Sequence, residues 1–187
     1  MPRIVTLLSL ACLAALPAGA AAASAFKLES PTIKPGATLT EAQVANTFGC
    51  EGKNLSPALK WSGAPPGTKS FAVTLYDPDA PTGSGWWHWV VFNIPASATA
   101  LDEGAGTSDG SKLPPGSAQG RTDFGTPGFG GACPPKGDKP HRYIFTVFAL
   151  KTDKLDIPAE ATPAYAGFMI RSNSLGSATL TARYGRK

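Results

Sequence analysis

The chain has 187 residues, which is the length of one domain. It holds 21 glycines and 18 prolines with only 16% charged residues, a composition typical of a turn-rich β protein and not of a helical bundle or a disordered chain. The net charge of +4 comes without a cluster of lysines and arginines, so we expect no nucleic acid as a partner.

Residues 1–25 have the pattern of a secretory signal peptide. Arg3 is followed by an apolar run to Leu16 and then by small residues that end in Ala-Ser-Ala. The apolar run is too short to cross a bilayer, so we expect cleavage near Ala25 and no transmembrane segment afterwards. Residues 26–187 are then one periplasmic or secreted domain, and the loss of Arg3 lowers its net charge from +4 to +3.

Four short strands, separated by glycine and proline turns, are expected in the first half of the mature chain. They cover residues 26–30, 57–61, 70–76 and 86–94. In the third, SFAVTLY, alternation places Phe71, Val73 and Leu75 on one face. The fourth, WWHWVVFNI, is almost continuously apolar, which predicts a central strand buried on both faces.

Alternation also assigns the one histidine of that fourth strand to a face. His88 is expected on the same face as Trp86, Val90 and Phe92. A histidine among aromatic residues is more often part of a core than of a site, so this position alone does not predict a function.

The second half of the chain begins with a long irregular region, residues 96–140, which is rich in glycine and proline. Strands are expected at 141–150 and 177–185 because both segments alternate between apolar and polar residues. Between them, Thr162 is a predicted helix N-cap, Pro163 the first helical residue and Gly176 the C-terminal stop. One mainly antiparallel β domain with a short helix near its end is therefore predicted.

Two cysteines, Cys50 and Cys133, remain after removal of the signal peptide. In an oxidising compartment, an even number of cysteines favours a disulfide. The sequence alone does not supply the Cα separation that a bridge requires, so a pair of buried free thiols is the alternative.

Two segments far apart in the sequence carry residue types suited to a binding site. In DPDAP (77–81), two prolines stiffen a turn and hold Asp77 at the end of a strand. The only two histidines, His88 and His141, each lie at the start of a strong strand after a glycine- and proline-rich loop. If these strands are close together, both imidazoles and Asp77 meet at one end of the sheet.

Such a site suits the binding of an anion better than catalysis. Imidazole N–H groups and the Tyr143 hydroxyl are donors for a phosphate or a carboxylate, and the neighbouring tryptophans can form an apolar wall. No Gly-x-Ser-x-Gly motif occurs, and the scattered histidines lack the spacing of a zinc site. We expect no enzyme, no metal and no cofactor; a hydrolase that uses both histidines is the weaker alternative.

The order of these motifs resembles the phosphatidylethanolamine-binding protein family. DPDAP is followed by Trp-x-His before an apolar strand, and then by PPKG and HRY. CEGKNLSPALKW (50–61) and GFGGACPPKG (128–137) are similar to its bacterial branch, the Raf kinase inhibitor-like proteins. The resemblance implies a large central antiparallel sheet packed on a smaller one, with a few short peripheral helices.

The resemblance also implies a small anion pocket and a ligand class. The residues carried over by motif are Asp77, His88, Pro134, Pro135, His141 and Tyr143, together with the backbone near Cys133. Trp86 is added to this predicted site as part of the aromatic wall. Members of the family bind phosphate-like groups and phospholipid head groups. The alternative is inhibition of an extracellular enzyme, such as a protease, through the 96–140 loops, with a protein partner that the sequence does not identify.

Two positions depart from the family pattern. Trp87 stands where animal members carry a second histidine, which predicts a more apolar pocket rim. Asn173 stands where a histidine is expected in the bacterial branch, so a ligand contact from the last helix is in doubt. A cytosolic kinase is not expected as the target of an exported protein.

Overall fold

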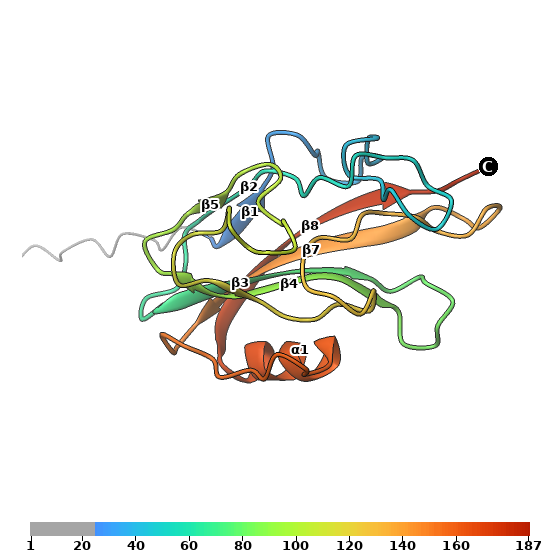
Figure 1. The fold of residues 1–187 in the computed structure, drawn as a ribbon. Helices are drawn as coiled ribbons and strands as arrows, with labels where there is room; N and C mark the ends of the chain where they lie inside the picture. The colour runs from blue at the N-terminus through green and yellow to red at the C-terminus, as the bar shows by residue number, and fades with distance from the viewer. Residues whose placement is uncertain (1–24) are drawn as a thin grey trace, which may run out of the picture.

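The computed structural model describes residues 25–187, and the predicted signal peptide lies outside them except for Ala25. A large antiparallel sheet has the strand order β6 (Ala118–Gln119), β4 (Trp86–Pro95), β3 (Ser70–Asp77), β7 (His141–Leu150) and β8 (Ser174–Tyr184). A small antiparallel sheet has the order β1 (Lys27–Glu29), β2 (Leu59–Ser62) and β5 (Ala100–Leu101). The small sheet covers one face of the large sheet, and α1 (Pro163–Ser172) covers the other (Figure 1).

This arrangement agrees with the predicted fold class, which the structure confirms as mainly β with two antiparallel sheets. The helical part is smaller than expected, because the described residues contain a single α-helix. The strand at 86–94 is buried on both faces as predicted, but the central strand is β3. No helix within residues 25–187 has the length and apolar character needed to cross a membrane.

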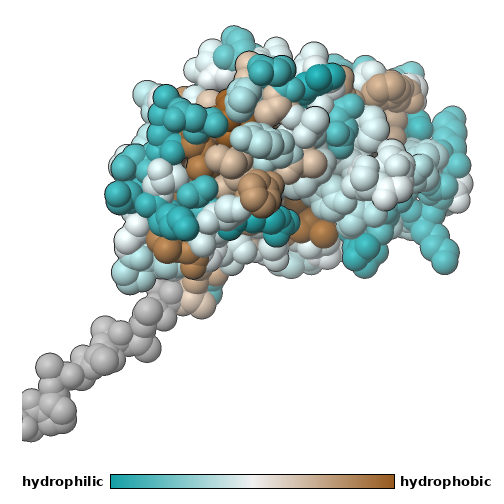
Figure 2. Space-filling view, turned by 90° about the horizontal axis from the view of Figure 1, so that it is seen from below, coloured by the Kyte–Doolittle hydropathy of each residue, from teal (hydrophilic) through white to brown (hydrophobic). Residues whose placement is uncertain are grey.

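The core has two parts, one on each face of the large sheet. Between the sheets, Phe71, Val73 and Leu75 of β3 pack in one buried cluster, which confirms the predicted alternation. On the other face, Phe148 and Ile170 belong to the cluster beneath α1. Each such side chain contributes about 1.5–3 kcal/mol when fully buried, so both layers hold the sheet in place. Figure 2 looks onto the α1 face, where apolar residues form separate patches among hydrophilic ones.

The helix begins where the sequence predicts and ends earlier. Thr162 is the N-cap, with its side chain accepting a hydrogen bond from the amide three residues on, and Pro163 is the first helical residue. The predicted stop at Gly176 is wrong, because the helix ends at Ser172 with Asn173 as its cap. The side-chain amide of Asn173 donates to the carbonyl four residues back at 2.8 Å, satisfying one free end of the helix. Gly176 lies instead within β8, the strand expected only from residue 177.

A β-bulge interrupts the pairing of β3 and β4 near the end of the sheet. Leu75 pairs with Trp89 and Tyr76 pairs with Trp87, so His88 is an extra residue without a partner on β3. A bulge breaks the strict alternation of side chains along a strand. It therefore determines which face of the sheet His88 occupies.

Candidate functional site

A cavity of about 310 Å³ lies at the end of the large sheet where β3 ends and β4 and β7 begin. The chain's C-terminus lies near this end of the sheet, at the right of Figure 1. The cavity is lined by Phe48, Ala80, Pro81, Thr82, Trp86, His88, Phe124, Cys133, Pro134, Pro135, His141 and Arg186. Of the residues predicted for the pocket, only Asp77 and Tyr143 do not line it, and both are buried behind its wall.

The strand order explains how the two histidines come together. β4 and β7 lie on either side of β3, so His88 and His141 flank the strand that ends at Asp77. The Asp77 carboxylate lies 2.8 Å from Nδ1 of His141, and the two side chains are only 3% and 4% exposed. Its other oxygen accepts the amide of Asp79 at 2.8 Å. Asp77 thereby orients one imidazole and closes the stiff turn that follows β3.

The second aspartate of the turn has a different partner. Asp79 accepts hydrogen bonds from the Arg142 guanidinium through both oxygens, at 2.6 and 2.9 Å, and from the Arg142 amide at 2.8 Å. The guanidinium lowers the pKa of Asp79 to about 2. This pair is partly exposed and joins the turn to β7 without touching the cavity.

His88 is placed by the bulge and by the glycine-rich loop. The predicted grouping of His88 with Val90 and Phe92 is wrong, because these two residues belong to the cluster beneath α1. The His88 ring instead packs edge to face with Tyr143 and Phe124, with centroids 5.3 Å apart in both cases. The extra residue of the bulge turns the histidine to the cavity side of the sheet.

The protonation of His88 follows from its surroundings. Its Nδ1 lies 2.8 Å from the carbonyl oxygen of Gly130, and a carbonyl only accepts, so Nδ1 carries the hydrogen. Burial lowers the pKa of His88 below its ordinary value of 6.5, which favours the neutral ring. Nε2 of His88 therefore carries a lone pair and no hydrogen. It binds an anion only when it is protonated or when the ligand brings a hydrogen of its own.

Tyr143 supplies a donor that the protein leaves unused. The side chain is fully buried, and its hydroxyl has no hydrogen-bond partner among residues 25–187. Burial raises the pKa of Tyr143 far above its usual range, so the hydroxyl keeps its proton. A buried polar group without a partner costs about 1–3 kcal/mol.

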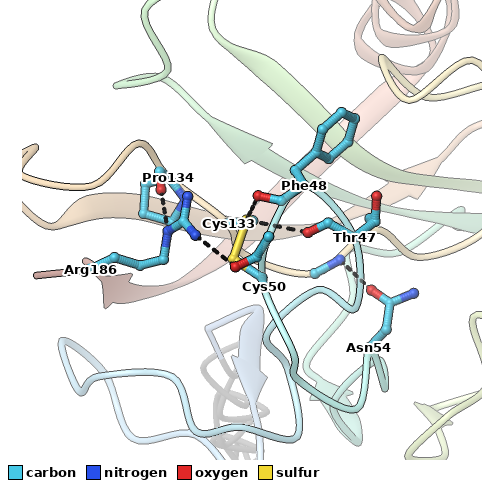
Figure 3. The surroundings of a disulfide bond; sticks show 9 residues. Thr47, Phe48, Cys50, Asn54, Cys133, Pro134 and Arg186 are labelled. Carbon is cyan, nitrogen blue, oxygen red and sulfur yellow. Dashed lines mark hydrogen bonds between the residues drawn. A yellow bond between two sulfur atoms is a disulfide. The ribbon is translucent and has the colours of Figure 1, made fainter.

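The opposite wall is made of loops that a disulfide joins. Cys50 and Cys133 are bonded, with Cα atoms 6.0 Å apart, which confirms the predicted bridge (Figure 3). Arg186 joins the same two loops, because its guanidinium donates to the carbonyls of Pro134 at 2.7 Å and Gly49 at 3.1 Å (Figure 3). The disulfide and the guanidinium together place Cys133 and Pro134 against the cavity.

Aromatic side chains form the rim. Phe124 packs against Trp86 at 5.4 Å and against Phe48 at 6.0 Å between ring centroids. Phe48 is 69% exposed and has a φ of +53°, a left-handed conformation that is unusual for a bulky residue. The residues Phe48, Phe124 and Arg186 were not predicted. They lie outside the motifs, and no local pattern marks them as neighbours of His88.

The neighbouring tryptophans do not form the wall that the sequence suggests. The prediction that Trp87 makes the rim more apolar is wrong, because its ring packs on the α1 side against Tyr76 and Gly167. Trp89 is fully buried between the sheets, where its indole N–H donates to Gln119. Only Trp86 lines the cavity.

The chemistry of the cavity is that of a pocket with donors at its base and apolar walls. Within residues 25–187, no three His, Cys, Asp or Glu side chains gather in a way that could hold a metal ion. The polar side chains that line the cavity are Thr82, His88, His141 and Arg186, and Tyr143 is buried against the His88 ring. The guanidinium, and either imidazole when its free ring nitrogen is protonated, are donors suited to the oxygen atoms of an anion.

Comparisons with known proteins cover most of the chain. Residues 29–185 match the family model described as phosphatidylethanolamine-binding protein. The UPF0098 protein YbcL of Escherichia coli is 58% identical over 88% of this chain and 90% of its own length. The UPF0098 protein YbhB of the same organism is 51% identical over 85% of this chain and 99% of its own length.

A solved structure and a further relative extend this similarity. The crystal structure of E. coli YbcL, described as a new member of the mammalian PEBP family, matches with a TM-score of 0.85 and covers 87% of this chain and 99% of that one. A Mycobacterium tuberculosis protein, named "Putative lipoprotein LppC", is 32% identical over 88% of this chain and 75% of its own length.

Proposed function

This chain belongs to the phosphatidylethanolamine-binding protein family, and from that premise we propose that its cavity binds a small anionic ligand without catalysis. The ligand carries a phosphate group, either as a free phosphate compound or as the head group of a phospholipid. The observation that supports this most strongly is the gathering of donors at one end of the sheet. His141 and Arg186 line the cavity, and His88 adds a donor there when its ring is protonated. The hydroxyl of Tyr143 is buried close by without a hydrogen-bond partner among residues 25–187.

The apolar walls strengthen this assignment. Prolines and aromatic rings surround the donors and lower the local dielectric constant. A charge-assisted hydrogen bond to a phosphate oxygen is stronger there than in water. The size of the cavity, about 310 Å³, accommodates a head group but not a folded protein segment.

The cavity offers little for nucleophilic catalysis, which supports a binding role. Cys133 is in a disulfide and has no free thiol. The only hydroxyl side chain that lines the cavity, Thr82, donates to the carbonyl of Gly85. A covalent mechanism requires a nucleophile in hydrogen-bond contact with a base, and no lining residue meets that requirement.

The proposed location is periplasmic or secreted, after cleavage near Ala25. The disulfide and the similarity to a protein named as a lipoprotein favour a place outside the cytoplasm. The finer assignment depends on the predicted signal peptide, which the N-terminal sequence of the exported protein would test.

A binding experiment tests the function. The full chain is expressed for export, and the purified protein is titrated with inorganic phosphate, phosphoethanolamine and phosphoserine while its melting temperature is followed. We expect a rise in melting temperature that is lost in His141→Gln and Arg186→Gln. Arg171→Gln is the control, because it removes the same charge from α1, on the other face of the sheet. A protein whose melting temperature responds to none of the three ligands would overturn the proposal.

The same variants distinguish the inhibitor alternative. The 96–140 region contacts the cavity through Gly130, which forms two hydrogen bonds with His88. This contact favours a role for the region as a wall of the cavity. If a captured protease were still bound by the His141→Gln variant but lost when these loops were shortened, inhibition would replace ligand binding as the function.

A further inference from the structure

His141 lies between two different cavities. One is the apolar cavity described above. The other has a volume of about 610 Å³, is also lined by His141, and is mostly charged: its other residues are Asp79, Asp138, Lys139, Pro140, Arg142 and Arg183. Asp138 lines only the charged cavity, so it reaches the imidazole from that side.

Both ring nitrogens of His141 are engaged by carboxylates. Nδ1 lies 2.8 Å from the Asp77 carboxylate, and this pair is almost completely buried. Nε2 lies 3.3 Å from Oδ2 of Asp138, whose side chain is 41% exposed. A buried pair persists, whereas an exposed pair is weak and exchanges readily with water. Nε2 is therefore the only ring nitrogen that a ligand can use, and a carboxylate of the protein occupies it.

The turn that carries Asp138 is anchored on its N-terminal side, where the Gly137 amide donates to the Arg186 carbonyl at 3.1 Å. The Asp138 amide makes a longer hydrogen bond of 3.4 Å to the carbonyl of Pro135. The Asp138 carboxylate has no hydrogen bond or ion pair within residues 25–187 other than the one to His141. Lys139 and Arg183, which line the same cavity, are cations toward which this carboxylate can turn.

We propose that Asp138 is an internal competitor of the ligand. Its carboxylate holds Nε2 of His141 until an anion arrives, and the anion displaces it toward Lys139 and Arg183. This inference rests on the proposed function, because it assumes that an anion binds at His141. The anion must displace the Asp138 carboxylate from His141, and the two negative charges then lie close together and repel each other. Asp138 therefore lowers the affinity of the site for anions of any kind.

Removal of one charge at fixed shape tests the inference. Asp138→Asn is compared with wild type and with Asp153→Asn, which removes an exposed carboxylate beyond the opposite end of β7. Each protein is titrated with inorganic phosphate by calorimetry, and the ring nitrogens of His141 are observed by nitrogen-15 NMR. We expect Asp138→Asn to bind phosphate about threefold to tenfold more tightly than the other two proteins. The Nε2 signal of His141 should shift in Asp138→Asn without phosphate and stay unchanged in Asp153→Asn.

The outcomes separate the two proposals. Binding by wild type together with equal or weaker binding by Asp138→Asn overturns the competitor role and leaves the proposed function in place. Binding by Asp138→Asn alone supports the competitor role in its strongest form. Absence of binding by all three proteins overturns the proposed function and the competitor role together.

Discussion

The two walls of the cavity are held by different kinds of interaction. The strand wall consists of His88 and His141. His88 lies at the bulge of β4, His141 is paired with Tyr184 of β8, and each imidazole makes a buried hydrogen bond. The loop wall consists of Phe48, Cys133 and Pro134 and has little regular structure. Its two loops are joined by one disulfide, by the Arg186 guanidinium and by a short β-bridge between Val44 and Ala132. We therefore expect the strand wall to keep its shape when the loop wall is loosened.

The largest effect is expected from loss of the disulfide. It joins residues 83 positions apart, and the chain-entropy model gives about 4–5 kcal/mol for a loop of this length. The Cys50→Ala/Cys133→Ala variant should lose about this much free energy of unfolding in urea, while the NMR signals of His88 and His141 keep their native positions. A reducing agent should destabilise wild type and leave the double variant unchanged. Loss of the native histidine signals would show that the strand wall depends on the loops.

A smaller loss is expected from Asp77→Asn. This substitution leaves the buried His141 beside a neutral group, and breaking a buried pair costs about 3–5 kcal/mol. Asp79→Asn is the matched comparison. It neutralises the other carboxylate of the same turn, which pairs with Arg142 and is partly exposed. In urea, the free energy of unfolding should fall clearly more in Asp77→Asn than in Asp79→Asn. Equal losses would mean that burial does not distinguish the two carboxylates.

The pH dependence of stability should reveal the burial of His88. Because burial lowers its pKa in the folded state, the unfolded chain binds more protons below about pH 6.5. The free energy of unfolding therefore falls as the pH is lowered from 7.5 to 5.5. In His88→Gln this fall should be smaller, and the Asp79 carboxyl does not interfere because it titrates near pH 2. An unchanged pH profile in His88→Gln would contradict a buried neutral ring.

The strand wall was largely predictable from the sequence. The strands at 70–76 and 141–150 follow from alternation, and the terminal positions of Asp77 and His141 follow from the proline turns beside them. The face of His88 did not follow, because one bulged residue reverses the alternation and nothing in the local sequence marks it. Local patterns predict local structure, and the bulge arises from pairing with β3.

The loop wall was predictable only where motifs existed. The prolines at 134 and 135 and the disulfide came from the resemblance and from cysteine counting. Arg186 and Phe48 lie far from these motifs in the sequence, and only the folded chain brings them to the cavity. The same holds for Trp87 and Trp89, whose identical side chains pack on opposite faces of the sheet, the first partly buried and the second fully buried.

The binding of phosphate to Tyr143→Phe tests the central claim most directly. The hydroxyl has no hydrogen-bond partner among residues 25–187, so its removal should leave the melting temperature unchanged or slightly higher. If the hydroxyl serves the ligand, calorimetry should show saturable binding of one phosphate per wild-type chain and an affinity at least about fivefold lower in Tyr143→Phe. Equal affinity in the two proteins, or no saturable binding by wild type, would contradict the account of this cavity as an anion site.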